Sequence, residues 1–158
     1  MKNESGVHVS LVMGKSRVAP LKSISIPRLE LTAATVGANL SRFILDEIDI
    51  DGITVHYWTD SMTVLRYLRN VSTRFKIFVA HRVQQIQNVS DVNAWNYVPS
   101  SQNPADLASR GINPEENEKL KFWLEGPQFL KETSQYDRMF EEPNDNQVDL
   151  ELSATIQS

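Results

Sequence analysis

Ile53-Thr54-Val55-His56-Tyr57-Trp58-Thr59-Asp60-Ser61 joins a strand pattern to a helix pattern through one carboxylate. The apolar residues of its first half alternate, which is typical of a strand, and Ser61 opens a helical pattern. A carboxylate at the carboxyl end of a strand lies where open α/β sheets place the groups that hold ligands. Asp60 and Ser61 are also common N-cap residues, so a purely structural role for them stays open.

Strand and helix patterns continue on both sides of this stretch. We expect strands at residues 6–13, 53–59 and 94–98. We expect helices at residues 27–48, 61–69, 74–87, 104–111 and 115–124. This alternation predicts an α/β fold. Three strands are few for so many helices, so we expect an incomplete sheet.

Length and composition indicate one globular domain. The chain has 158 residues and no cysteine, which excludes disulfides and thiolate metal sites. No apolar run reaches the roughly 18 residues that span a bilayer. The polar N-terminus leads into no signal-peptide core. We therefore expect an intracellular protein, cytoplasmic or nuclear, with no membrane partner.

The net charge of -4 hides an uneven distribution. Residues 1–111 carry 12 Lys and Arg against 9 Asp and Glu, whereas residues 112–158 carry 4 against 11. Residues 61–90 contain no acidic side chain at all. Five cations in that window are our predicted nucleic-acid-binding residues: Arg66, Arg69, Arg74, Lys76 and Arg82. A solvated helix face is the alternative interpretation.

Three carboxylates stand at matching ends of successive elements: Glu30, Asp60 and Asp106. Each has a structural alternative, because acidic residues stabilise helix N-termini. Together they predict one site at an edge of the sheet. Clustered carboxylates repel one another unless a cation holds them, and hard oxygen ligands suit Mg²⁺ or Mn²⁺. The three histidines show no ligand spacing, and we interpret them as structural or surface residues.

Six motifs stand in order between residues 7 and 130. They are Lys15-Ser16-Arg17-Val18-Ala19-Pro20, Ile26-Pro27-Arg28-Leu29-Glu30-Leu31, Trp58-Thr59-Asp60-Ser61, Phe78-Val79-Ala80-His81-Arg82-Val83, Asn103-Pro104-Ala105-Asp106-Leu107-Ala108-Ser109-Arg110-Gly111 and Gly126-Pro127-Gln128-Phe129-Leu130. Together they resemble the ribonuclease H-like region of the polyproteins of BEL/Pao LTR retrotransposons.

The resemblance implies a metal-dependent endonuclease that hydrolyses the RNA strand of RNA–DNA hybrids with four carboxylates and two Mg²⁺ ions. Glu30 corresponds to the helix glutamate of that family, Asp60 to its second aspartate and Asp106 to its last. No counterpart of its first aspartate is found, and the chain is expected to begin at the family's third strand. The fold predicted is a ribonuclease H-like mixed sheet flanked by helices, without its first two strands.

The predicted organisation has three parts. Residues 7–112 form a partial ribonuclease H-like domain, residues 113–130 a helix with a Gly-Pro-x-Phe-Leu connector, and residues 131–158 an acidic, disordered tail. The expected partners are an RNA–DNA hybrid and the reverse transcriptase part of the same polyprotein. We expect little or no hydrolysis by this chain. The alternatives are a non-catalytic nucleic-acid-binding module of the same fold and a scaffolding piece.

Overall fold

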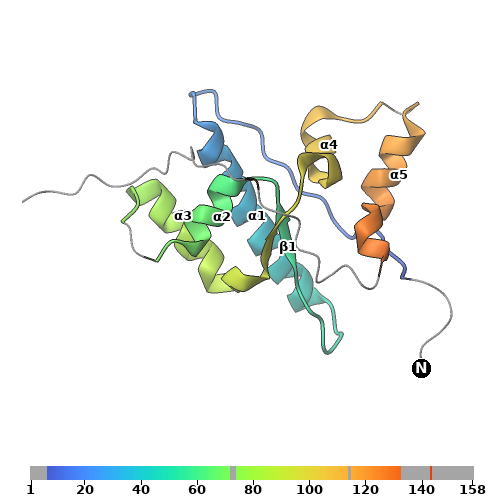
Figure 1. Ribbon diagram of the computed structural model, residues 1–158, viewed down its shortest axis with the longest axis horizontal. Helices are drawn as coiled ribbons and strands as arrows, with labels where there is room; N and C mark the ends of the chain where they lie inside the picture. The colour runs from blue at the N-terminus through green and yellow to red at the C-terminus, as the bar shows by residue number, and fades with distance from the viewer. Residues whose placement is uncertain (1–6, 72–73, 114, 133–142, 144–158) are drawn as a thin grey trace, which may run out of the picture.

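The computed structural model describes residues 7–71, 74–113, 115–132 and 143 (Figure 1). Seven regular elements alternate along these residues. They are α1 (Ile26–Glu47), β1 (Tyr57–Thr59), α2 (Met62–Arg69), α3 (Ile77–Val89), β2 (Trp95–Tyr97), α4 (Ala105–Arg110) and α5 (Asn117–Glu125). Short 3-10 turns stand at Val92–Ala94, Ser100–Gln102 and Gln128–Lys131. The predicted α/β class is confirmed.

The sheet in the described part of the chain consists of β1 and β2, which run parallel with Tyr57 opposite Trp95. Their rings stack at a centroid distance of 4.6 Å and an angle of 8°. Successive residues of a strand point to opposite faces. Tyr57 accordingly meets Ser41 of α1 through a 2.6 Å hydroxyl–hydroxyl hydrogen bond. Trp58, its neighbour, meets the ring of Phe129 edge-on at 5.1 Å on the other side.

The helices form two groups around β1 (Figure 1). Helices α1, α2 and α3 pack together on one side, and their buried side chains form the core. Its members include Leu31, Leu65, Tyr67, Val79, Ile86 and Trp95. Helices α4 and α5 pack against each other on the other side and contribute no fully buried residue. The arrangement places helices on both sides of the strands, as the sequence pattern indicates.

Helix α1 follows from its local sequence. Pro27 stands in its first turn, where the missing N–H costs nothing. Leu31, Thr35 and Ala38 recur at helical spacing and are the residues that α1 buries. Thr35 Oγ1 donates to the Leu31 carbonyl at 2.8 Å, which satisfies the buried hydroxyl. The prediction of a helix over residues 27–48 is confirmed within one residue at each end.

The predicted strand at residues 6–13 is wrong, because residues 7–20 are neither helix nor strand. The alternation is nonetheless visible in burial, since Val7 and Val9 are half-buried while His8 and Ser10 are exposed. Leu11 donates its N–H to the Leu124 carbonyl at 2.8 Å, at the end of α5. The segment therefore packs along a helix end, and a strand requires a neighbouring strand to pair with.

Two other boundaries differ from the pattern. Only the last three residues of the predicted strand at 53–59 pair with β2, and Ile53 stays 42% exposed. Helix α3 begins at Ile77, three residues later than expected. The Phe75 ring instead packs edge-on against the Tyr67 ring, with the ring centroids 5.2 Å apart. The residues before α3 therefore pack on the core and do not extend the helix. Most of the predicted acidic tail lies outside the described residues.

No helix in the described ranges combines the length and the apolar character that crossing a membrane requires.

Candidate functional site

Glu30 is tied to the start of α2 by a serine hydroxyl. Ser61 Oγ donates to Glu30 Oε2 at 2.7 Å and accepts from the backbone N–H of Val64 at 3.2 Å. Ser61 is therefore the N-cap of α2, as its position predicts. Because Ser61 directly follows Asp60, this hydrogen bond brings the N-terminal part of α1 to the carboxyl end of β1.

Asp60 is half-buried at the end of β1. Its Oδ2 accepts a hydrogen bond of 2.8 Å from Ser100 Oγ, in the 3-10 turn that follows β2. The parallel pairing continues here, since Val98 donates its N–H to the Thr59 carbonyl at 3.0 Å. Asp60 thus stands at the carboxyl edge of both strands, where open α/β sheets bind ligands.

Asp106 lies in the first turn of α4 and pairs with Arg110, with Nη2 and Oδ2 3.2 Å apart. It lines a pocket of about 310 Å³ together with Ser100, which belongs to the turn that contacts Asp60. The remaining lining residues come from the same turn, from the residue that follows it, and from α4 and α5: Ser101, Asn103, Leu107, Glu118, Lys119 and Phe122.

Serines connect the surroundings of the three predicted carboxylates, which come from elements distant in the sequence. Glu30 and Asp60 meet through Ser61, and Asp60 meets the pocket of Asp106 through Ser100. Their oxygens are the type that Mg²⁺ prefers. In the part of the chain that the structure describes, however, no group of three or more His, Cys, Asp or Glu is placed to hold a metal ion. The assignment of Mg²⁺ or Mn²⁺ to these residues stays a prediction.

Four of the predicted nucleic-acid-binding residues lie around the connection from α2 to α3. Arg66 and Arg69 stand in the last turn of α2, where cations suit the helix dipole. Arg69 Nη2 is 3.5 Å from the Trp95 carbonyl. Arg74 and Lys76 are exposed just before α3, with Lys76 at its N-cap.

The fifth predicted residue, Arg82, points from α3 toward α1. Its Nε donates to Thr32 Oγ1 at 3.1 Å, and its guanidinium lies 3.7 Å from the centroid of the Phe78 ring. Arg28 approaches the same ring at 4.9 Å. Burial lowers the pKa of Arg82, and repulsion from Arg17 and Arg28 lowers it further. Arg82 is thus part of a second group of cations that the sequence pattern did not indicate.

Sequence reasoning missed the hydroxyls of this site. The sequence pattern predicts Ser61 as an N-cap residue, but nothing in the sequence indicates its hydrogen bond to Glu30, which is 31 positions away. No sequence pattern indicates a role for Ser100 in the site, since its partner Asp60 is 40 positions away. Such pairs become visible only when α1, β1 and the turn after β2 are brought together.

Comparison with known proteins supports the resemblance carried by the motifs. Residues 1–61 match the family model described as the Pao retrotransposon-like RNaseH-like domain. The match contains Glu30 and Asp60, whereas Asp106 and the cations of α2 and α3 lie beyond it. Neither the curated proteins nor the solved structures contain a significant match. The match supports the predicted family resemblance, and residues 1–61 are similar to the Pao retrotransposon-like RNase H-like domain.

Proposed function

We propose that this chain is an RNase H-like retrotransposon module that binds RNA–DNA hybrids through their phosphates. The observation that carries the proposal is the fold of residues 61–90. This window contains no carboxylate, and it forms α2 and α3 with five cations. The match of residues 1–61 to an RNase H-like family supports nucleic acid as the partner.

The proposed binding is mainly electrostatic. Lys and Arg side chains that neutralise phosphates release condensed counterions, so affinity falls steeply with salt. Five phosphate contacts predict a slope of log K against log salt of roughly -4. Distinction between RNA and DNA would come from helix shape and the 2′-hydroxyl, with little sequence preference.

We also propose that this chain does not hydrolyse the hybrid in isolation, although hydrolysis is the activity that the resemblance implies for the parent family. The two-metal mechanism needs carboxylates that converge on both ions. Glu30 and Asp60 are instead engaged by serine hydroxyls, and Asp106 is paired with Arg110. These contacts support a binding module over a nuclease.

The binding proposal is tested with a fluorescein-labelled hybrid of 16 base pairs and fluorescence anisotropy over a range of salt. We expect Arg74→Gln with Lys76→Gln to weaken binding and to make the salt slope shallower by about 2, one unit for each lost phosphate contact. The matched control is Lys119→Gln with Lys121→Gln, two exposed lysines of α5. Equal losses in both double variants would show that only net charge matters and would contradict the assignment.

The catalytic proposal is tested by incubating the same hybrid with the chain in Mg²⁺ or Mn²⁺. We expect no cleavage above that of buffer. Cleavage that disappears in Glu30→Gln and in Asp60→Asn would refute the proposal and would assign catalysis to these carboxylates. Calorimetric titration with Mn²⁺, repeated with Asp60→Asn, separates metal binding from cleavage.

A further inference from the structure

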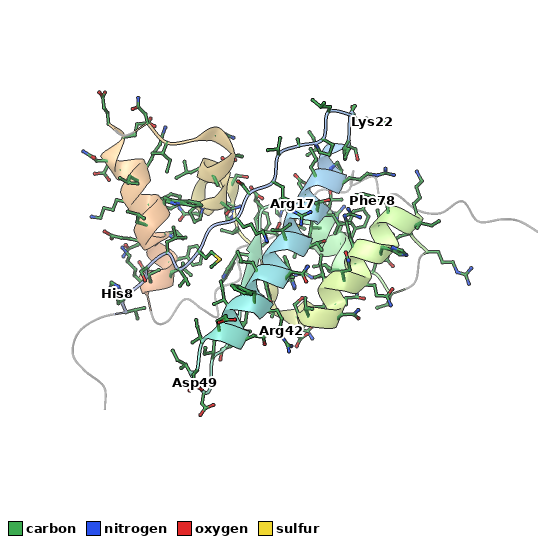
Figure 2. All side chains as sticks on the ribbon, turned by 180° about the vertical axis from the view of Figure 1, so that it is seen from behind. His8, Arg17, Lys22, Arg42, Asp49 and Phe78 are labelled. Atoms are coloured by element: carbon green, nitrogen blue, oxygen red, sulfur yellow. The ribbon has the colours of Figure 1, made fainter. Side chains whose placement is uncertain are left out.

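A second pocket lies between the extended N-terminal segment, α1 and α3. Its volume is about 260 Å³. The lining residues are Lys15 and Arg17 of the segment, Thr32, Thr35, Val36 and Asn39 of α1, and Arg82 and Gln85 of α3. Figure 2 shows Arg17 beside α1 and Phe78 on the neighbouring helix α3. The pocket thus exists only because the segment from residue 7 to 20 crosses α1.

The charge of this pocket has one sign. Lys15, Arg17 and Arg82 all line it, and no Asp or Glu is among its lining residues. Within the described ranges no salt bridge involves any of these three cations. Burial lowers the pKa of Arg82, and repulsion from the nearby charge of Arg17 lowers it further. Like charges held together destabilise a fold unless an anion joins them.

Arg82 is held in place for such an anion. Its Nε bonds to Thr32 Oγ1, whose own proton goes to the Arg28 carbonyl at 2.7 Å. The Phe78 ring supports the plane of the guanidinium at 3.7 Å. The N–H groups on Nη1 and Nη2 have the planar fork geometry that matches two oxygens of a phosphate. A preorganised arginine loses less side-chain freedom on binding than an exposed one.

The size of the pocket limits the ligand. Its volume of about 260 Å³ is below the usual range for drug-sized ligands, which begins at roughly 300 Å³. It equals the space of roughly nine water molecules in the liquid. A phosphate with its attached oxygens fits this space. The hydroxyl and amide side chains in the lining add polar partners for such a group.

We infer that this pocket binds a phosphate group, and that in the nucleic-acid complex this group is one phosphodiester of the bound strand. The choice of nucleic acid as the source rests on the proposed function. The pocket is formed by the N-terminal segment, α1 and α3, and is distinct from the exposed cations that precede α3. It would therefore fix the position of one phosphate, while those cations attract the backbone more generally.

The first test is titration of the ¹⁵N-labelled full chain with sodium phosphate, against sodium chloride at equal ionic strength. We expect saturable amide shifts at Arg17, Thr32 and Arg82 with phosphate alone. Lys15→Gln with Arg17→Gln should weaken this binding at least about tenfold. The matched control is Lys22→Gln with Arg42→Gln, both exposed and outside the pocket, with Arg42 already paired to Asp46 (Figure 2). Equal shifts with chloride, or undiminished binding in the pocket variant, would overturn the inference.

The second test separates nucleic acid from free phosphate as the source. Anisotropy with the labelled hybrid should show roughly fivefold weaker binding for the pocket variant than for its control. Unchanged hybrid affinity, with phosphate shifts still lost, would overturn the assignment to a phosphodiester and leave a site for free phosphate. Failure of the proposed function would be seen separately. In that case the wild-type chain would not bind the hybrid, or the Arg74→Gln, Lys76→Gln variant would bind it as tightly as the wild-type chain does.

Discussion

Ser61 shows how much one buried hydroxyl does in this protein. It is 6% exposed, caps α2 and holds the Glu30 carboxylate. An N-cap serine contributes about 1 kcal/mol, and a hydrogen bond to a charged group contributes somewhat more than a neutral one. The same side chain therefore stabilises a helix start and positions a candidate site residue.

Ser61→Ala should lower the free energy of unfolding by about 1–2 kcal/mol, because it removes both bonds. Urea denaturation followed by circular dichroism measures this change. Ser109→Ala is the control, since Ser109 is exposed and its hydroxyl only donates to a carbonyl of its own helix. The control should change stability by less than about 0.5 kcal/mol. Equal effects of the two substitutions would contradict the double role of Ser61.

At the scale of elements, glycine ends both helices of the second group. Gly111 follows α4 with φ 77°, and Gly126 follows α5 with φ 70°. Only glycine adopts such angles without strain. The two positions differ in their surroundings. A Cβ at Gly111 meets open space, whereas at Gly126 it would lie 3.2 Å from both Leu130 Cδ1 and Val9 Cγ1.

Gly126→Ala should therefore destabilise the protein more than Gly111→Ala. Both substitutions carry the backbone strain of roughly 1–2 kcal/mol, and the crowded position adds about 1 kcal/mol or more. Gly37→Ala, inside α1 with no atom near the new methyl, should instead stabilise by about 0.5–1 kcal/mol. Denaturation midpoints of the three variants test this order. Equal losses at the two helix ends would show that the segment around Val9 does not pack on the connector.

At the scale of the whole molecule, the described residues form a core and a more exposed pair of helices. The core of α1, α2 and α3 contains nearly all fully buried side chains, whereas α4 and α5 bury none completely. The connector after α5 joins the two groups, because Phe129 is only 8% exposed and meets the Trp58 ring. Local stability follows buried apolar contact, so the two groups should differ in dynamics.

Hydrogen exchange followed by mass spectrometry should show slow exchange in α1 and α3 and faster exchange in α5. Phe129→Ala removes the contact with Trp58, at a cost of about 3 kcal/mol for a buried aromatic ring. The amides of α5 should then exchange at least about tenfold faster, with those of α3 unchanged. Equal acceleration in α3 and α5 would show that the protein unfolds as one unit.

Much of the secondary structure was predictable because its signals are local. Helix α1 followed from Pro27 and the spacing of its apolar residues, and α4 and α5 stop at glycines that the sequence displays. The strand predicted at residues 94–98 is present as β2, Trp95–Tyr97. Glu30 and Asp60 were chosen as site candidates by their places at element ends. Asp60 directly follows β1, whereas Glu30 is the fifth residue of α1 and lies just beyond its first turn.

Tertiary packing decided everything that depends on a distant partner. The alternating residues 7–13 form no strand because their neighbour is the end of α5, and alternation alone does not supply a partner. The same crossing segment carries Lys15 and Arg17 to Arg82 and creates a pocket of one charge sign. Hydroxyls hold the carboxylates at contacts 31 and 40 positions apart in the chain. Periodicity and capping act over a few residues, whereas a site requires side chains that only folding brings together.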